Sequence, residues 1–479
     1  MKQFDIIVIG AGQNGLTAAA MLAKAGRKVV VLERRDIIGG LAASEEFHPG
    51  FRTTGPLHEA KPNQMVVDAL QLSLNDGVSR TGAWTAAGAQ TIDALTTALS
   101  LFVTREPPEL GGNLANSLGL LTRGISIRRL GRDRLHDLLR IPPMCAADWL
   151  DEICETKADK PADALRAIAG SFTGPRSPGT AGSLLWDLTL STGQARCSPP
   201  KLIAALETAA RNGGVEIRTG AKVSRIRIAN GRIAGVTLTG GDEIDAPVVA
   251  ASCDPKTTFL KLLAPSDVPS GLGQHIRSYR MNGVTAKINL AIKGPLRFTS
   301  RPELDVERAV IAESLDDIER AFDAVKYRQF SQRPVLDICV PTVANPELAP
   351  EGHSVVSILV YYAPYDLEGG WTDQQRDKLG DTVVNVLKDY VPDIESKIIA
   401  REVLTPLDIE ARYGVTGGHI HHGDHTLDQL IVRPCPECAR YETPIDGLYL
   451  CGSGSHPGGG LTCMPGFLAA QRMLKRRRT

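Results

Sequence analysis

A chain of 479 residues is too long for one simple hydrophobic core, so its length predicts two or more domains. Its 43% hydrophobic and 23% charged residues are typical of a soluble globular protein, and its 54 basic residues balance its 54 acidic ones, which argues against a nucleic-acid partner. Nine cysteines, an odd number, indicate reduced thiols in a cytoplasmic protein rather than a disulfide framework.

The first elements follow the pattern of a dinucleotide-binding unit. An apolar run at residues 4–9 predicts a buried strand, the alanine-rich stretch 16–26 predicts a helix, and "KVVVLE" at 28–33 predicts a second strand. Glu33 ends this second strand, where an acid can accept hydrogen bonds from a ribose hydroxyl and would repel the extra phosphate of NADP. The order strand, helix, strand and acid therefore predicts a bound dinucleotide.

A glycine-rich turn, "GAGQNG", joins the first strand to the helix. Gly10 allows a tight turn, Gly12 lets a pyrophosphate approach the backbone, and Gly15 lets helix and strand pack closely. The helix N-terminus offers unpaired N–H groups and the positive end of its dipole to the phosphates. The turn therefore predicts where the diphosphate binds.

A second glycine pair, Gly39 and Gly40, follows the acid in "ERRDIIGGLAAS" and gives the backbone another close approach to a diphosphate. This extension resembles that of FAD-binding amine oxidases and phytoene desaturases, and the resemblance implies FAD as the cofactor. Those families usually have arginine after the pair, whereas this chain has Leu41, so that Arg34 or Arg35 could supply the contact. We find no second GxGxxG followed by a helix, and we expect no separate NAD(P) domain.

Residues 201–252 return the chain to the dinucleotide-binding domain. They predict a helix, a hairpin that turns at Asn230-Gly231, and a buried strand at 246–252. The resemblance implies that the backbone of Val223 meets the adenine, and the alternative is that Val223 is a core strand residue.

Two less regular blocks interrupt this domain. The predicted substrate-binding domain comprises residues 61–194 and 256–414, and the predicted FAD-binding domain comprises residues 1–60, 195–255 and 415–479. The predicted fold class is α/β (α+β): a Rossmann-like FAD-binding domain interrupted by a mixed sheet-and-helix substrate domain.

The C-terminal part repeats the strand–glycine–helix pattern. A strand at 447–450 leads into "CGSGSHPGGG", and a helix follows from Pro465. The resemblance places this segment beside the ribityl chain and sets its N–H groups near the flavin C2 carbonyl. The family often has an acid after the first glycine of this turn, whereas here Ser453 retains only a hydroxyl. The cofactor-binding residues that the resemblance implies in this segment are Gly452, Ser453, Gly460, Leu461 and Thr462.

Three further stretches sharpen the resemblance: "GPRSPGT", "GGHIHHGDHTLDQL" and "RPCPECARYETPIDGLYLCGSGSHPGGG". They are similar to the FAD-dependent phytoene desaturase and carotene isomerase group of the amine oxidase superfamily, in the branch of the pyridine nucleotide-disulfide oxidoreductase domain-containing proteins. The similarity covers the whole chain and is densest at both ends.

The cysteines do not fit a redox disulfide. No cysteine precedes Cys145, whereas flavin disulfide reductases carry their cysteine pair soon after the first FAD motif. Cys435 and Cys438 have CxxC spacing, but without a second CxxC they favour surface or loop thiols, or a chance pair beside the flavin, over a zinc site. We therefore predict no metal and read Cys451 and Cys463 as loop residues.

Two histidines are candidate catalytic residues. His422 precedes Gly423 in a cluster that holds four of the ten histidines, and the resemblance places a histidine there against the flavin cavity. His58 follows Gly55-Pro56, in a loop that runs past the reactive edge of the flavin in related enzymes. Either imidazole can move a proton near neutral pH, and the alternative for each is structural hydrogen bonding.

The sequence therefore predicts an FAD-dependent oxidoreductase of the desaturase or dehydrogenase type. The resemblance implies an apolar small-molecule substrate, such as a polyene or isoprenoid, which loses hydride or is isomerised, and an external electron acceptor, oxygen or quinone. One alternative is a flavin amine or amino-acid oxidase, although 5% aromatic residues make an aromatic cage less expected. Another is a non-catalytic FAD-binding protein that acts through partners, which Leu41 and Ser453 favour.

The expected location depends on the apolar runs and the tail. No uninterrupted apolar run is long enough to span a bilayer, and the N-terminus lacks the pattern of a signal peptide. The basic run at 475–478 suits a solvated helix end or attraction to anionic lipid. We expect a cytoplasmic protein, with peripheral membrane contact as the alternative, and no nucleic-acid partner.

Overall fold

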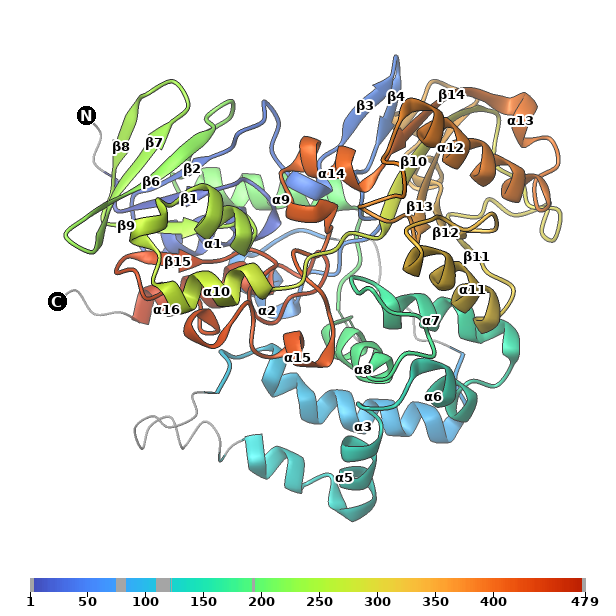
Figure 1. The fold of residues 1–479 in the computed structure, drawn as a ribbon, viewed down its shortest axis with the longest axis horizontal. Coiled ribbons are helices and arrows are strands. Elements are labelled where there is room, and N and C mark those ends of the chain that lie inside the picture. Colours follow the sequence, from blue (N-terminus) through green and yellow to red (C-terminus); the bar gives the residue numbers. More distant parts are fainter. Residues whose placement is uncertain (1–3, 75–82, 109–120, 122, 192–193, 476–479) are drawn as a thin grey trace.

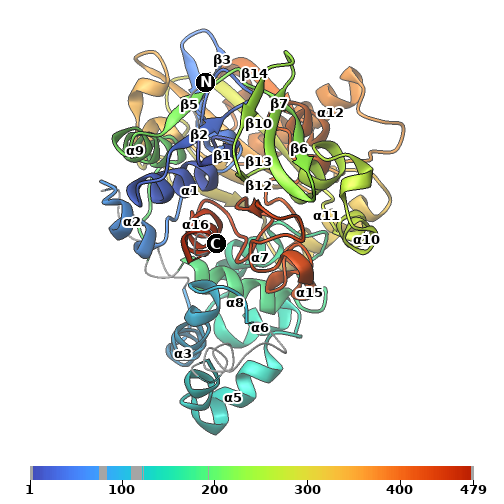
Figure 2. The same ribbon diagram turned by 90° about the vertical axis from the view of Figure 1, so that its left-hand side faces the viewer.

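The structure is a computed structural model of the chain and describes residues 4–74, 83–108, 121, 123–191 and 194–475. Figure 1 shows two sheets side by side above a lobe of helices, and the turned view in Figure 2 shows the same lobe extending below the sheets. The mixed α/β architecture that the sequence predicts is confirmed.

The first sheet is parallel and has five strands in the order β15-β9-β1-β2-β5. Its strands are β1 (Ile6–Ile9), β2 (Val29–Leu32), β5 (Glu216–Arg218), β9 (Val248–Ala251) and β15 (Leu448–Leu450). They come from the N-terminal, middle and C-terminal parts of the chain, as the sequence predicts. Because all five run in one direction, their carboxyl ends share one edge, which is where ligands bind to open parallel sheets.

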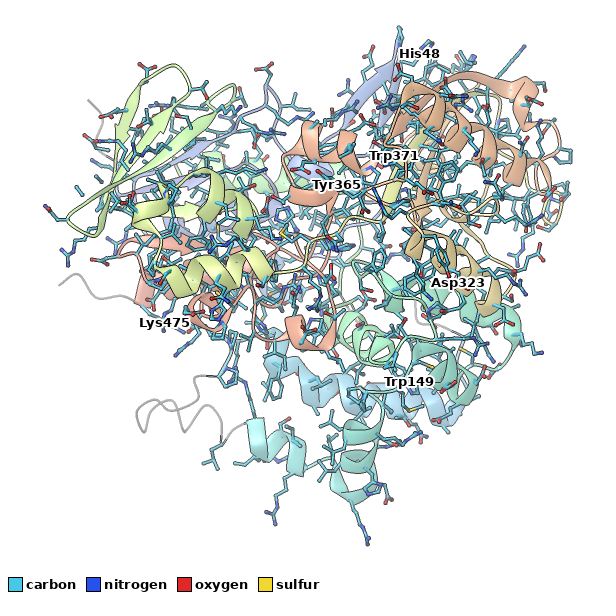
Figure 3. All side chains as sticks on the ribbon, viewed as in Figure 1. His48, Trp149, Asp323, Tyr365, Trp371 and Lys475 are labelled. Carbon is cyan, nitrogen blue, oxygen red and sulfur yellow. The ribbon has the colours of Figure 1, made fainter. Side chains whose placement is uncertain are left out.

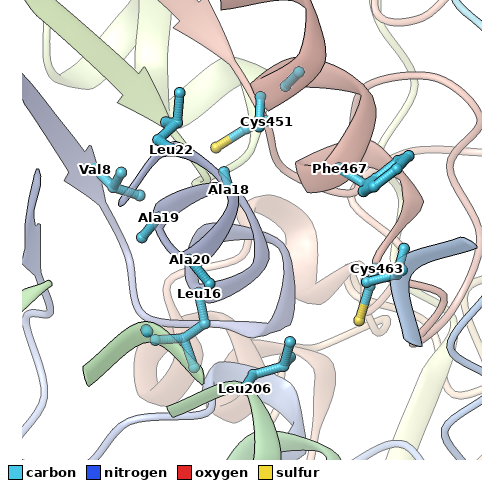
Figure 4. Close-up of a cluster of buried hydrophobic side chains, with 14 of the residues drawn as sticks. Val8, Leu16, Ala18, Ala19, Ala20, Leu22, Leu206, Cys451, Cys463 and Phe467 are labelled. Carbon is cyan, nitrogen blue, oxygen red and sulfur yellow. The ribbon is translucent and has the colours of Figure 1, made fainter. Parts of the chain in front are cut away.

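Three helices pack with this sheet: α1 (Gln13–Lys24), α9 (Pro199–Asn212) and α16 (Met464–Lys475). Figure 4 shows Leu16 of α1, Leu206 of α9 and Phe467 of α16 in one buried apolar cluster. The thiols of Cys451 and Cys463 lie in the same cluster, and burial raises the pKa of Cys463 to about 12. Both are free cysteines in the loop between β15 and α16, as predicted, and their side chains contribute to the packing of the core.

The turn between β1 and α1 depends on two glycines. Gly10 has a φ of +99°, a conformation that L side chains rarely adopt. A Cβ atom on Gly15 would lie 2.0 Å from the carbonyl oxygen of Gly10. Gly10 therefore forms the tight turn, and Gly15 lets the helix pack against the strand.

The second sheet is antiparallel, with the order β11-β12-β13-β10-β14. Its strands are β10 (Thr285–Lys293), β11 (Arg308–Ile311), β12 (Val335–Cys339), β13 (His353–Tyr361) and β14 (Ile398–Leu404). One face packs on α12 (Asp373–Lys388), through Ile288, Ile358 and Leu387 among others. Side chains alternate between the two faces of a strand, so Lys287 and Asp337 occupy the opposite face.

Two small antiparallel sheets complete the strands. They are formed by β6 (Val223–Ala229), β7 (Arg232–Leu238) and β8 (Glu243–Asp245), and by β3 (Glu45–His48) and β4 (Phe51–Thr53). Asn230 and Gly231 have φ values of 53° and 74°, which a two-residue type I′ hairpin turn requires. The predicted hairpin is confirmed.

The helical lobe contains α3 (Ala86–Val103), α5 (Gly131–Arg140), α6 (Ala146–Ile153), α7 (Lys160–Ile168) and α8 (Thr180–Ser191). Among the described residues α3 alone is long and apolar enough, by length and composition, to cross a membrane. Gln90 and Asp93 interrupt its apolar run, so the sequence did not predict a spanning length there. Its Ile92 and Leu95 pack with the buried Trp149 of α6, labelled in Figure 3, so one face of α3 contributes to the core of the helical lobe.

The remaining helices are α2 (Gln64–Leu70), α10 (Ser270–Ser278), α11 (Leu315–Lys326), α13 (Ile394–Lys397), α14 (Pro406–Tyr413) and α15 (Leu427–Leu430). α14 lies between the two sheets in Figure 1, where Tyr365 donates a hydrogen bond of 2.6 Å to Glu410 of this helix (Figure 3). The predicted domain boundaries remain a prediction.

Candidate functional site

The two glycine-rich turns meet in space. The side chain of Gln13, at the start of α1, donates to the carbonyl oxygen of Gly460 at 2.8 Å and accepts from the backbone N–H of Cys463 at 2.9 Å. Asn14 donates to the hydroxyl of Ser453 at 3.0 Å. Two buried amides therefore join segments that are more than four hundred residues apart in sequence. Neither amide was predicted from the sequence. Two adjacent amide side chains at the start of an otherwise apolar helix are the feature that could have identified them.

A cavity of about 650 Å³ runs along the carboxyl edge of the parallel sheet, within the usual size range of small-molecule sites. It collects most of the residues predicted to bind the cofactor, and His422 also lines it. The predicted residues in its wall are Gly10, Gly12, Glu33, Arg34, Gly39, Gly40, Leu41, Val223, Ser453, Gly460, Leu461 and His422. We call it the first cavity.

The wall of the first cavity fits a dinucleotide. A Cβ atom added to Gly12 or Gly460 would meet no atom of the described residues within 4 Å, so both backbones face open space. The buried carboxylate of Glu33 accepts hydrogen bonds from the N–H groups of Ala11 (2.8 Å) and Arg35 (3.0 Å). A carboxylate has about four acceptor positions, so this one can still accept from a ribose hydroxyl. Bare backbone and a positioned acid are what the diphosphate and ribose of FAD need.

Three predicted residues lie outside this wall. Gly15 packs beneath the turn, and a Cβ atom on Gly452 would lie 2.4 Å from the carbonyl oxygen of Ser252, so both serve close packing. Thr462 lines a second cavity instead. Arg34 lines the first cavity, but its guanidinium donates to the backbone carbonyls of Ala411 and Arg412 at 3.1 and 2.5 Å. These carbonyls hold the Arg34 side chain against α14.

The second cavity, of about 490 Å³, lies between the helical lobe and the face of the antiparallel sheet that is turned away from α12. It shares four wall residues with the first cavity: Leu57, Ile420, Gly460 and Leu461. His58 lines the second cavity and His422 lines the first, so the structure does not bring the two predicted catalytic histidines to one place. The two cavities therefore adjoin at these four residues.

A buried polar cluster, formed by His58, Lys287, Arg308 and Asp337, adjoins the second cavity. Lys287 Nζ lies 2.6 Å from Nε2 of His58, whose Nδ1 lies 3.5 Å from a carboxylate oxygen of Asp337. Nη2 of Arg308 donates to both carboxylate oxygens of Asp337, at 3.1 and 3.2 Å. These contacts favour the His58 tautomer with its proton on Nδ1, so that Nε2 accepts from Lys287.

Burial dominates the proton affinities in this cluster. It lowers the pKa of Lys287 to about 7, and burial together with the charge of Lys287 lowers the pKa of His58 to about 3. Burial alone would raise the pKa of Asp337, but the charge of Arg308 and, to a smaller extent, the contact with His58 hold it well below its usual range. At neutral pH the cluster therefore contains a neutral imidazole, an ionised carboxylate and an amine poised between its two forms.

Apart from His58, no member of this cluster was predicted from the sequence. Asp337 stands in an otherwise apolar strand and Lys287 in a buried part of β10, and both pair in register with Leu359 of the strand between them. A charged residue inside an apolar strand was the available signal. The sequence does not show which strands are neighbours in the sheet, so it could not show that these two side chains lie close together.

His422 occupies a strained position beside the first cavity. Its φ is +57°, and its carbonyl oxygen accepts a hydrogen bond of 3.2 Å from Tyr279. Burial lowers its pKa to about 4, so its imidazole is neutral at pH 7. Nearby, His425 accepts from the backbone N–H of Gly459 at 3.2 Å. The histidine-rich segment at 419–425 therefore stabilises the C-terminal glycine-rich turn at 451–460.

The cysteine pair that the sequence singled out lies away from both cavities. Cys435 and Cys438 are buried in the apolar cluster on the β6–β8 side of the parallel sheet. Within the part of the chain that the structure describes, no group of three or more His, Cys, Asp or Glu side chains could hold a metal ion. The pair is therefore a packing feature.

Two family models match this chain, each over more than half of its length. The model described as "FAD dependent oxidoreductase" matches residues 5–306, and the model described as "Flavin containing amine oxidoreductase" matches residues 169–472. Each match includes one of the two glycine-rich turns.

Curated relatives match over nearly the whole chain. A mouse protein called pyridine nucleotide-disulfide oxidoreductase domain-containing protein 2 is 31% identical over 98% of this chain and 93% of its own length. A limonene dehydrogenase component from Castellaniella defragrans is 28% identical, over 98% and 94%. Phytoene desaturase from Fusarium fujikuroi is 26% identical, over 98% and 89%.

A solved structure of an oxidoreductase from Methanosarcina mazei has the same fold. It superposes with a TM-score of 0.62 at 18% identity and covers 98% of this chain and 100% of its own. At this identity the match bears on the fold alone.

Proposed function

The chain belongs to the family of FAD-dependent oxidoreductases, and we propose that it removes hydride from, or isomerises, an apolar substrate of the isoprenoid or polyene class. The resemblance, the fold class and the FAD cofactor that the sequence predicts are confirmed. Two full-length relatives are named for limonene and phytoene, which are both isoprenoid hydrocarbons, and these names support the proposed substrate class.

One observation carries the proposal: two cavities of different character share a wall. The first is shaped for a dinucleotide, and the second has room for a small molecule. Three of the four shared residues, Leu57, Ile420 and Leu461, are apolar, and the fourth is Gly460. A substrate C–H bond at this wall is shielded from water, as hydride transfer requires.

The residues of the chain have separable roles in this reaction. Gly12 and Gly460 give the cofactor access to backbone N–H groups, and Glu33 anchors a ribose. When bound, FAD supplies the two-electron acceptor for hydride. In desaturation two C–H bonds break and one C=C bond forms, so the substrate also loses a proton. His58 lines the second cavity and contacts the Lys287 amine, so this pair can hold that proton.

The electrons then pass to an external acceptor, for which we propose oxygen or a quinone. Isomerisation needs no acceptor, because the substrate has the same oxidation state before and after. The two modes are therefore distinguished by whether an acceptor is consumed.

We also propose that the protein is cytoplasmic and touches a membrane from the surface. None of the residues of α5 is buried, and Leu139 is 70% exposed among the basic side chains Arg132 and Arg140 of the same helix. Exposed leucines beside arginines suit an anionic lipid surface. Of the basic tail, Lys475 pairs with Glu106 at 2.6 Å, and residues 476–479 lie outside the described part.

One observation favours a second candidate, a flavin amine or amino-acid oxidase. The second cavity carries several charged side chains, among them Arg308 and Asp337, and these suit a polar substrate better than a hydrocarbon. The amine oxidoreductase family model also matches residues 169–472, which contribute most of this cavity.

The test is anaerobic titration of the purified protein. We expect a yellow protein whose flavin absorbance bleaches on addition of limonene or phytoene, or an isomerised product without bleaching. A colourless protein that cannot be reconstituted with FAD would contradict the proposal. Hydrogen peroxide release with amines, in a protein that hydrocarbons do not bleach, would move the assignment to an amine oxidase.

A further inference from the structure

The second cavity is apolar on one side and charged on the other. The wall that it shares with the first cavity presents Leu57, Ile420 and Leu461. Away from that wall four cationic side chains and three carboxylates line it: Lys61, Arg166, Arg196 and Arg308, and Glu59, Asp187 and Asp337. A substrate that was hydrocarbon from end to end would cover these charges without compensating them, which is costly.

The carboxylates in this lining already have cationic partners. Glu59 pairs with both Lys61 (3.2 Å) and Arg196, and Asp187 pairs with Arg166 at 2.7 Å. Arg166 is also bound from outside the cavity by Asp163 at 3.1 Å. The lining therefore has no carboxylate that still needs a cation.

Arg308 is different from these pairs. It uses only Nη2 to bind Asp337, and its Nη1 and Nε have no hydrogen-bond partner among the described residues. Its side chain is 33% exposed and lines the second cavity. The N–H groups of Nη1 and Nε of a permanently charged guanidinium are therefore available to a ligand, and such groups bind a carboxylate through charge-assisted hydrogen bonds.

We propose that the substrate is an apolar chain that ends in a single carboxylate, with the carboxylate on the free N–H groups of Arg308 and the reacting carbons at the wall of Leu57, Ile420 and Leu461. This inference rests on the proposed function and adds the acid group to its substrate. The four cations and three carboxylates of the lining leave one net positive charge, which a single carboxylate compensates and a diphosphate head exceeds.

Asp337 sets how strongly Arg308 binds an acid. Its carboxylate occupies Nη2 and neutralises part of the positive charge. Asp337→Asn should therefore strengthen acid binding, whereas Arg308→Met should weaken it. Two substitutions in one contact with opposite expected effects make the test independent of whether either variant loses some stability.

The experiment compares matched ligands on the FAD-containing protein, with binding followed by the change in flavin absorbance. The first pair is farnesoic acid and its methyl ester, and the second is decanoic acid and its methyl ester. We expect each acid to bind at least 10-fold more tightly than its ester. Arg308→Met should abolish this preference and leave the ester unchanged, while Asp337→Asn should enlarge it about 3-fold.

Arg333→Met is the matched control, because this arginine is 67% exposed, pairs with Asp389 and does not line the cavity. Equal binding of acid and ester, binding of neither, or a preference that survives Arg308→Met would overturn the inference. Tighter binding of farnesyl diphosphate than of farnesoic acid would also overturn it. Failure to hold FAD contradicts the proposed function instead, and a preference shown only by decanoic acid contradicts its isoprenoid part alone.

Discussion

The two cavities share a wall but differ in the chemical groups that line them. The first is made largely of backbone, with glycines where the wall must stay bare and one buried acid, Glu33. The second is made of side chains, which α7, α8 and three strands of the antiparallel sheet bring together with opposite charges. Glycines, which have no side chain, define the wall of the first cavity, and charged side chains define the wall of the second.

This difference has a consequence for how each cavity tolerates change. The backbone of the first cavity is closely packed at Gly15, beneath the wall, and faces open space at Gly12, in the wall. A substitution beneath the wall should therefore affect cofactor and fold together, whereas one in the wall should affect the cofactor alone. A side-chain wall can lose one member of an ion pair and stay folded, with altered charge. Four substitutions test that contrast, from the largest expected effect to the smallest.

Gly15→Ala should have the largest effect. Its Cβ atom would lie 2.0 Å from the carbonyl oxygen of Gly10 and 3.2 Å from Cβ of Ser252, so that α1 must move away from the sheet. We expect a loss of about 4 kcal/mol in the free energy of unfolding, together with loss of FAD. Thermal unfolding and the ratio of flavin to protein measure the two losses.

Gly12→Ala is the control for that prediction, because its Cβ atom meets no atom of the described residues within 4 Å. This variant should keep the stability of the apoprotein and lose flavin only. If Gly15→Ala retained both its melting temperature and its FAD, the view that backbone packing shapes the first cavity would be wrong.

Lys287→Met tests the second cavity through pH. The pKa of Lys287 is about 7 in the folded protein and about 10.4 in an unfolded chain, so between these values the unfolded chain binds the extra proton. Wild-type stability should therefore rise from pH 7 to pH 10, and Lys287→Met should remove about 3 kcal/mol of that rise. Denaturant unfolding at several pH values measures it.

Lys293→Met, an exposed position at the end of the same strand, is the control and should leave the pH dependence of wild type unchanged. A slope between pH 7 and pH 10 that is the same in Lys287→Met as in wild type would show that the buried amine is not the source.

How much could be predicted differs between the two cavities for the same physical reason. Gly10, Gly12 and Glu33 were found because a backbone site for a diphosphate requires glycine and an acid at set spacings within one βαβ unit. Lys287 and Arg308 were not found, because they become neighbours only through the order of strands in an antiparallel sheet. Local spacing is visible in a sequence, and strand order is not.

Asp337→Asn should have a smaller effect on stability than the lysine substitution. It removes the negative charge and one of the two oxygens to which Arg308 donates at 3.1 and 3.2 Å, and we expect a loss of about 2 kcal/mol at pH 7. Because the pKa of Asp337 is held below its usual range, this loss should shrink as the pH falls below about 4, where the unfolded carboxyl takes up its proton.

Asp366→Asn is the control, because Asp366 pairs with Arg328 at 3.2 Å but is 69% exposed, and such pairs contribute little to stability. Equal losses of unfolding free energy in the two variants at pH 7 would mean that burial of Asp337 does not increase the contribution of its ion pair to stability.

Glu33→Gln should have the smallest effect and return the test to the first cavity. The amide oxygen can still accept one of the hydrogen bonds now donated by the Ala11 and Arg35 N–H groups, but the NH₂ group cannot accept the other, and the charge is lost. We expect FAD to bind about 10-fold more weakly, equivalent to about 1.4 kcal/mol, with acid binding in the second cavity unchanged. Fluorescence titration of the apoprotein with FAD measures it, with the 51% exposed Glu46→Gln as control. A change in acid binding as large as the change in FAD binding would show that the two cavities are not separable in the way their construction indicates.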